Sequence, residues 1–248
     1  MMDMTRPAAV KLGTRECNVA IGSCQKSHQL ERAVELLQGM QSQSLQPNVV
    51  TYNTVVSTCA KRNCWELALK FLGLAQAEGI RVEKVSYTSA LIACEKCEHL
   101  AWARELLCKM EEASVEADLF TYNAAIGACG KSGHSHWALA LFHKMQDLGF
   151  VPEVVTYTAV ISACQKAECL ELALSFLAEM RQRRLKPDVM AYSAAICPLG
   201  VSSAWSGSLQ VLERMRRDSP LPNLVTLGSA LAINNFKSSP WGPEGVRN

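Results

Sequence analysis

The chain has 248 residues, 49% of them hydrophobic, and a formal net charge of +2. A charge this small does not by itself indicate a nucleic-acid-binding protein, and no long run of one sign marks a charged tail. The longest uncharged stretch, 189–212, contains Pro198 and Gly200 and keeps the register of a repeat, which excludes a membrane-spanning helix there.

One pattern returns every 35 residues along the chain. Three rows of residues share it: Tyr52, Tyr87, Tyr122, Tyr157 and Tyr192; Cys24, Cys59, Cys94, Cys129 and Cys164; and Met40, Met110, Met145, Met180 and Met215. Ala75 stands where the third row would carry a methionine. A fixed period of this length indicates a repeat array, in which each unit packs mainly on its neighbours.

Six complete copies fit the period, at 14–48, 49–83, 84–118, 119–153, 154–188 and 189–223. Residues 224–236 begin a seventh copy, and the Ser-, Gly- and Pro-rich residues 237–248 predict a disordered tail. The leader, residues 1–13, is too short for a recognisable signal or transit peptide, so it leaves the cellular location open.

Each copy has the pattern of two helices. In the second copy, Tyr52, Val56 and Cys59 follow one another at i, i+4 and i+7, which places them on one face of a first helix. A second helix carries a small residue four positions before a large one, a pairing that lets neighbouring helices interlock: Ala33, Ala68, Ala103, Ala138 and Ala173 precede Leu37, Leu72, Leu107, Phe142 and Leu177. We therefore expect an all-α fold, an α-solenoid (superhelix) of stacked antiparallel helix pairs.

The ends of these helices also have signals. Gly79 and Gly149 lie where a left-handed residue would close the second helix. We expect Thr51, Ser86, Thr121 and Thr156 to be N-caps of first helices, because a hydroxyl accepts a hydrogen bond from the first turn. Pro198 and Gly200 predict that the first helix of the sixth copy ends early.

The tyrosine, cysteine and methionine rows are expected to form the core. The 11 cysteines favour buried free thiols in a reducing compartment over a disulfide framework, because five of them share one place in the repeat. Cys94 and Cys97 form a lone CxxC near His99, which is too little for a four-ligand zinc site, so we expect no metal and no cofactor. No catalytic constellation stands out, so the chain is not expected to be an enzyme.

The opening Val-Val-Thr-Tyr-Asn at 49–53, the alanine and methionine places of the second helix, and the Pro-Asp or Pro-Asn boundary resemble the pentatricopeptide repeat family. The resemblance covers 14–223 and part of the seventh copy. It implies a protein that reads about one base of single-stranded RNA per repeat through side chains at the fifth and last places. Those pairs are Asn18 with Asn48, Asn53 with Glu83, Thr88 with Asp118, Asn123 with Glu153, Thr158 with Asp188, and Ser193 with Asn223.

The family's correspondence implies the tract pyrimidine, pyrimidine, G, pyrimidine, G, A, read 5′ to 3′. Glu83 and Glu153 depart from the usual Asp or Asn, so the bases at those two repeats are specified only as pyrimidines. Alternatively, the last-place residues are turn formers or caps with no role in readout.

Two further rows match the family. The apolar second-place residues Val50, Val85, Phe120, Val155 and Met190 are of the kind that packs between bases, with Arg15 in the first copy; ordinary packing between repeats is the alternative. Lysines at the thirteenth place, Lys26, Lys61, Lys96, Lys131 and Lys166, are of the kind that contacts RNA phosphates. Their alternative role is to complement the helix dipole.

The resemblance therefore implies sequence-selective RNA binding in the processing, stabilisation or editing of transcripts, with a mitochondrion or chloroplast as the implied location. Protein partners are also compatible with it, and no membrane partner is expected. The competing hypothesis is a protein-binding helical scaffold, which would have no reason to keep the pairing between the fifth and last places.

Overall fold

The computed structural model describes residues 13–167, 169–196 and 205–217. These residues form twelve α-helices and no strand. Residues 1–12 of the expected leader, the partial seventh copy at 224–236 and the tail at 237–248 lie outside the described residues, as do Pro198, Gly200 and Asn223. The chain divides into two compact units, the first made of residues up to 97 and 106–116, the second of 98–105 and those from 117 onward.

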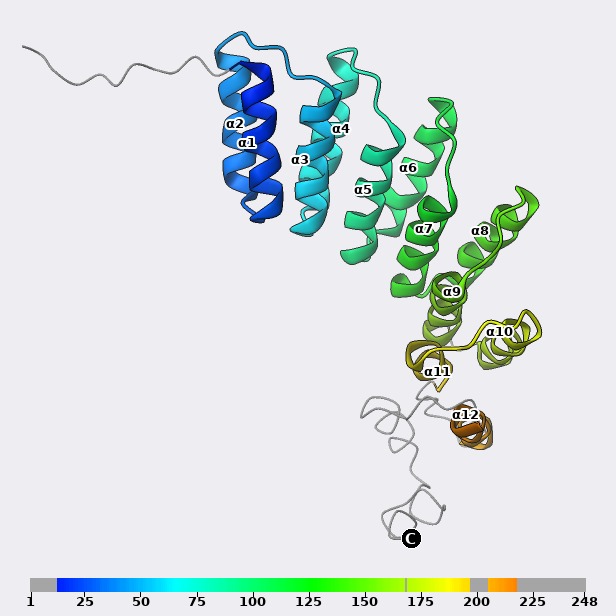
Figure 1. The fold of residues 1–248 in the computed structure, drawn as a ribbon. Helices are drawn as coiled ribbons and strands as arrows, with labels where there is room; N and C mark the ends of the chain where they lie inside the picture. The colour runs from blue at the N-terminus through cyan, green and yellow to red at the C-terminus, as the bar shows by residue number, and fades with distance from the viewer. Residues whose placement is uncertain (1–12, 168, 197–204, 218–248) are drawn as a thin grey trace, which may run out of the picture. The chain divides into compact units, whose positions relative to one another are not determined.

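The helices alternate between the first and second helix of each pair (Figure 1). The first helices are α1 (Thr14–Lys26), α3 (Val49–Lys61), α5 (Lys84–Lys96), α7 (Leu119–Ser132), α9 (Val154–Lys166) and α11 (Val189–Ala195). The second helices are α2 (Leu30–Ser42), α4 (Trp65–Ala77), α6 (Leu100–Glu112), α8 (Ser135–Asp147), α10 (Leu170–Gln182) and α12 (Trp205–Arg217). The fold class is thus the predicted one, a helical-repeat solenoid.

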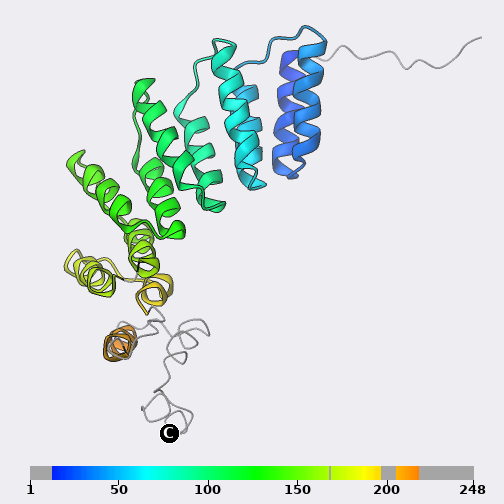
Figure 2. The ribbon, with the colours of Figure 1, turned by 180° about the vertical axis from the view of Figure 1, so that it is seen from behind.

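Within each unit the helices form two layers. In the first unit α1 packs on α3 and α3 on α5, while α2 and α4 each pack against the α3 layer; in the second, α7 packs on α9 and α9 on α11, with α8 and α10 behind (Figures 1 and 2). At Gly130 the contact between α7 and α9 is so close that an added Cβ would lie 2.8 Å from the Ala159 carbonyl oxygen. None of the described helices is long and apolar enough to span a membrane.

The predicted core is confirmed. The tyrosine, cysteine and methionine rows are all buried in the described residues, and so is Ala75. The small-and-large pairs of the second helices are buried as well, from Ala33 and Leu37 to Ala173 and Leu177. Because these positions repeat every 35 residues, the same side chains meet again at each junction between pairs and the core runs continuously through each unit.

The N-caps differ from the prediction. The residues that start the first helices α3, α5, α7 and α9 are Asn48, Glu83, Asp118 and Glu153, each three positions before the expected cap, and Asp188 starts α11, for which no cap was predicted. Thr51, Ser86, Thr121 and Thr156 lie inside the first turn at N3. In the capping box of α3, the Thr51 amide donates to Asn48 Oδ1 and the Asn48 amide donates to Thr51 Oγ1, each at 3.1 Å.

The predicted helix ends are confirmed. Gly79 and Gly149 have φ of +72° and +83°, the left-handed conformation that closes a helix. Ser44, Ser114 and Arg184 adopt it at the same place in other copies. Helix α11 ends at Ala195 after 7 residues, about half the length of the other first helices, as Pro198 and Gly200 predict.

Candidate functional site

The fifth-place residues lie on the first helices, one turn inside the N-terminus, and the last-place residues cap the next first helix. In the first unit these two places meet. Asn18 Nδ2 donates to Asn48 Oδ1 at 3.2 Å, and Asn53 Nδ2 donates to Glu83 Oε2 at 3.2 Å. Two predicted pairs are therefore in direct contact, although their members are 30 residues apart.

In the second unit the contacts are less direct. Asn123 Oδ1 accepts a hydrogen bond from Thr156 Oγ1 at 2.7 Å, and the same hydroxyl accepts one from the Glu153 amide at 3.1 Å. Thr156 thus links the fifth and last places of this repeat.

Thr158 and Asp188 each bond to their own helix. Thr158 Oγ1 donates to the Val154 carbonyl at 2.8 Å, and Asp188 Oδ1 accepts the Ala191 amide at 2.7 Å. Thr88 likewise donates to the Lys84 carbonyl at 2.9 Å. Its predicted partner Asp118 belongs to the other unit, where it caps α7, so that pair stays a prediction. Ser193 lies half-buried on α11, and Asn223 is outside the described residues.

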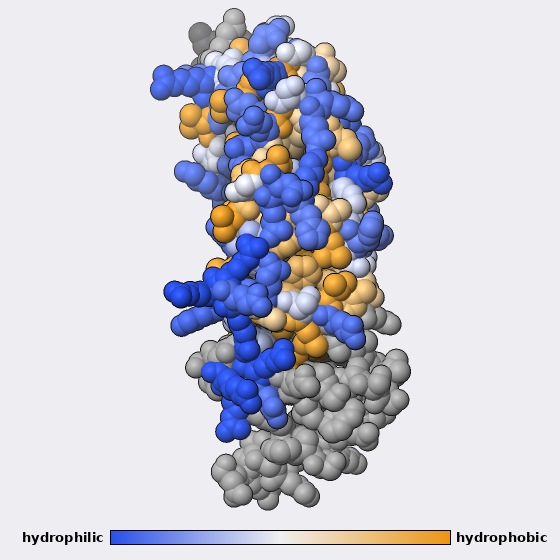
Figure 3. Space-filling view, turned by 90° about the vertical axis from the view of Figure 1, so that its right-hand side faces the viewer, coloured by the Kyte–Doolittle hydropathy of each residue, from blue (hydrophilic) through white to orange (hydrophobic). Residues whose placement is uncertain are grey.

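The second-place row is exposed. Val50, Val85, Phe120, Val155 and Met190 keep between 56% and 63% of their surface accessible. Ordinary packing between repeats would have buried these side chains, so that alternative does not describe them. On the face shown in Figure 3, apolar side chains (orange) lie among hydrophilic ones (blue).

At the first junction the rows converge. An open depression is lined by Thr14, Arg15, Asn18, Val19, Asn48 and Val50. The second-place residues of two successive copies, Arg15 and Val50, therefore border the same hollow as the Asn18–Asn48 pair. A flat ring in this depression would have an amide edge to bond and a side chain to pack against on each side.

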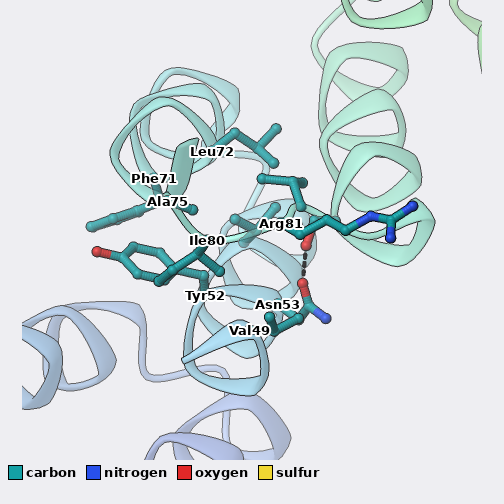
Figure 4. A pocket seen from close by; sticks show the side chains of 11 residues that line it. Val49, Tyr52, Asn53, Phe71, Leu72, Ala75, Ile80 and Arg81 are labelled. Carbon is teal, nitrogen blue, oxygen red and sulfur yellow. Dashed lines mark hydrogen bonds between the residues drawn. The ribbon is translucent and has the colours of Figure 1, made fainter. Parts of the chain in front are cut away.

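The pocket at the second junction is lined differently, by the fifth-place Asn53 together with core side chains such as Tyr52 and Phe71. Asn53 lies beside Val49 on α3, and its amide oxygen accepts a hydrogen bond from Ser86 (dashed in Figure 4). Arg81, on the segment that leads into α5, lines the same pocket and is exposed. A guanidinium at this place adds a donor with fixed geometry for a phosphate or a carbonyl.

The lysine row lies at the C-terminal ends of the first helices, in the last turn of α1, α3, α5, α7 and α9. Lys26, Lys61 and Lys96 are exposed. Lys166 is 3.8 Å from Glu98 and also donates to the Lys131 carbonyl, so it is already engaged. The position suits both the dipole role and a phosphate contact.

The cysteines of the repeat row lie in the core. The ten described cysteines are free, and burial raises the pKa of the Cys59, Cys94 and Cys129 thiols to about 12, which makes them poor nucleophiles and poor metal ligands at neutral pH. Within the described ranges, no three His, Cys, Asp or Glu side chains gather in a way that could hold a metal ion.

The sequence did not reveal the third-place hydroxyls as part of the site. Thr51 Oγ1 donates to Asn18 Oδ1 at 2.6 Å, Ser86 to Asn53, and Thr156 to Asn123. The signal was present in the spacing, because a hydroxyl stands 33 residues after each of these three asparagines. It was interpreted as an N-cap instead.

Three family models match the chain. One described as a pentatricopeptide repeat domain matches 72–132 and 140–200, one described as the PPR repeat family matches 16–61, and one described as a PPR repeat matches 50–80 and 120–150. Together they cover 16–200. A search of curated proteins finds no match.

Solved structures support the same fold. The pentatricopeptide repeat protein PPR10 from maize matches with a TM-score of 0.64 and 25% identity over 92% of this chain and 33% of the maize protein. PPR10 in complex with an 18-nt psaJ RNA element matches at 0.56, with 23% identity over 92% of this chain and 37% of that one. The PPR domain of the protein-only RNase P 1 of Arabidopsis thaliana, in complex with tRNA, matches at 0.59, with 16% identity over 70% of this chain and 91% of that domain. This chain spans about a third of the length of PPR10.

Proposed function

The chain belongs to the pentatricopeptide repeat family, and on that premise we propose that it binds single-stranded RNA sequence-selectively, about one base per repeat. The observation that carries the proposal is the depression at the first junction. There two exposed second-place residues, Arg15 and Val50, border a hydrogen-bonded pair of asparagine amides. This combination suits a nucleobase, because the two faces of the base can pack against the flanking side chains and its polar edge can hydrogen-bond to the amides.

The expected tract is pyrimidine, pyrimidine, G, pyrimidine, G, A. The complexes of PPR10 with RNA and of the RNase P domain with tRNA support the class of ligand. Resemblance to the family further suggests that the chain acts by occupying its RNA in the processing, stabilisation or editing of transcripts in a mitochondrion or chloroplast. Further repeats or protein partners would add the specificity that six bases lack.

The direct test is equilibrium binding of the full 248-residue chain to a labelled RNA that carries the tract, against an RNA of scrambled order. We expect a clear preference for the tract. Equal weak binding to both RNAs, or none, would contradict the proposal and favour the protein-binding scaffold.

A matched pair of variants locates the binding surface. Phe120 on α7 and Leu148 at the end of α8 are similarly exposed, at 62% and 58%, but lie in different layers of the second unit. Stacking of one base on an aromatic ring is worth about 1–3 kcal/mol, so Phe120→Ala should weaken binding by roughly five-fold or more. Leu148→Ala should leave the affinity unchanged. Equal effects of the two variants would show that RNA does not lie along the first helices.

A further inference from the structure

Each of the three asparagines at the fifth place accepts a hydrogen bond from the hydroxyl at the third place of the following repeat. The bonds are Thr51 to Asn18 at 2.6 Å, Thr156 to Asn123 at 2.7 Å, and Ser86 to Asn53. Thr51 and Thr156 have no exposed surface, and Ser86 is 2% exposed. These hydroxyls therefore lie behind the asparagines, where they contact the amide and not the surface on which a base would lie.

The direction of these bonds follows from their other partners. The Asn48 amide donates to Thr51 Oγ1, and the Glu153 amide donates to Thr156 Oγ1, each at 3.1 Å. A backbone N–H only donates, so each hydroxyl oxygen accepts there and has one proton left to donate. Thr156 directs it to Asn123 Oδ1; Thr51 has two acceptors within reach, Asn18 Oδ1 at 2.6 Å and Asn48 Oδ1 at 3.1 Å, and the shorter contact is to Asn18.

The contacts of the asparagine Nδ2 atoms indicate the same orientation of the side-chain amide. Asn53 Nδ2 faces Glu83 Oε2 at 3.2 Å, and an ionised carboxylate only accepts. Asn18 Nδ2 similarly faces Asn48 Oδ1 at 3.2 Å. The amide is thus held from both sides, with its oxygen turned back toward the third place and its NH₂ toward the last place.

We propose that the third-place hydroxyl of the following repeat is a specificity-determining positioning residue. It occupies the asparagine oxygen, so the amide offers a base its second N–H donor. This donor suits the carbonyl oxygens of a pyrimidine, whereas the Watson–Crick edge of guanine presents two N–H donors beside its one acceptor, O6. The inference rests on the proposed RNA-binding function and adds Thr51, Ser86 and Thr156 to the residues that determine which base is bound.

The junction after Thr158 has the opposite polarity. The next third-place residue is Ala191, which has no hydroxyl, and Thr158 gives its proton to the Val154 carbonyl. The lone pairs of Thr158 and the carboxylate of Asp188 remain as acceptors. Acceptors suit guanine, which is the base that the family's correspondence implies at this repeat.

The test replaces one hydroxyl and measures base selectivity instead of affinity. Thr156→Val keeps the shape of the side chain and removes the donor, while Thr156→Ser keeps the donor. The full-length variants are titrated with RNAs that differ only at the fourth base, pyrimidine or guanine. Losing one hydrogen bond should reduce the pyrimidine-to-guanine affinity ratio by roughly two- to thirteenfold in Thr156→Val. Thr156→Ser should restore the ratio.

Ser162→Ala is the matched control. Ser162 is on the same helix, α9, and bonds only the Thr158 carbonyl, so its removal should leave the ratio at the fourth base unchanged. Thr51→Val, read at the first base, repeats the test at an independent junction in case Thr156→Val does not fold.

The outcomes separate the two proposals. If the parent protein prefers a pyrimidine and folded Thr156→Val or Thr51→Val keeps that preference in full, the positioning role is overturned and RNA binding stands. If the parent protein shows no base preference at either position, the readout itself fails and the positioning role fails with it.

Discussion

The strongest consequence of the hydroxyl–asparagine contact is that two substitutions should be needed to give one repeat the base preference of another. Thr158→Asn alone places an amide at the fifth place without the hydroxyl that orients it. Thr158→Asn combined with Ala191→Thr supplies both. We expect the single variant to lose its preference for guanine at the fifth base and to gain little for a pyrimidine, whereas the double variant should prefer a pyrimidine.

The structure indicates that Ala191→Thr is tolerated. Ala191 is fully buried at N3 of α11, but Thr51, Thr121 and Thr156 occupy the same place in other copies and are fully buried too. The new hydroxyl would accept the Asp188 amide, as Thr121 accepts the Asp118 amide at 3.4 Å. The substitution therefore completes a capping box, which stabilises the start of a helix.

The expected size follows from one oriented hydrogen bond, worth about 0.5–1.5 kcal/mol net, or roughly two- to thirteenfold in relative affinity. The assay is equilibrium binding to four RNAs that differ only at the fifth base. A complete switch in Thr158→Asn alone would refute the need for the third-place hydroxyl. Retained guanine preference in the double variant would refute the assignment of this repeat to that base.

Three other properties are open to measurement. If the five lysines contact phosphates, the logarithm of the RNA affinity should fall against the logarithm of salt concentration with a slope of about −3.5, and a flat response in salt titrations would exclude that role. Glu83→Asp should raise the free energy of unfolding by about 0.5–1 kcal/mol, because Glu83 makes no side-chain bond to the first turn of α5 and aspartate is a better N-cap; thermal unfolding by circular dichroism would reveal a loss instead. Since burial raises the pKa of Cys59, Cys94 and Cys129 to about 12 from 9.0, the folded state keeps these protons to higher pH than the unfolded state. Stability should therefore be insensitive to these thiols below pH 9 and fall between pH 9 and 12, and urea titrations across that range that show no decline would contradict their burial.

The core was predictable because the buried positions recur with the same period as the sequence pattern. Tyr52, Cys59 and Ala68 each recur every 35 residues, and a position that recurs in one chemical type is one that the same neighbours surround each time. The helix ends at Gly79 and Gly149 were predictable because glycine adopts a positive φ without steric cost, whereas Ser44, Ser114 and Arg184 take the same conformation without that signal.

The N-caps were mis-assigned because two good cap residues stand three positions apart. Asn48 and Thr51 both have side-chain oxygens that accept hydrogen bonds from backbone amides, and the residue types alone do not show which of the two is the N-cap. In the common capping box the hydroxyl is at the N-cap and the carboxylate or amide at N3. In α3 and α7 the order is reversed, with Asn48 and Asp118 at the cap and threonines at N3. The side-chain hydrogen bonds at each junction depend on which of the two residues is the N-cap, so the sequence alone did not predict them.

The observed caps also explain why the last place carries the residues it does. Asn48, Asp118 and Asp188 each accept an amide of the first turn, so each contributes to the stability of its helix before any RNA is present. Asn and Asp are near-equal N-caps, but an amide has donors and a carboxylate has none. Under the proposed readout, exchanging one for the other changes the hydrogen-bonding edge offered to a base while the helix start is kept. The selectivity of a repeat is thereby separable from its stability, which is the property that an array needs if its copies are to bind different bases on one fold.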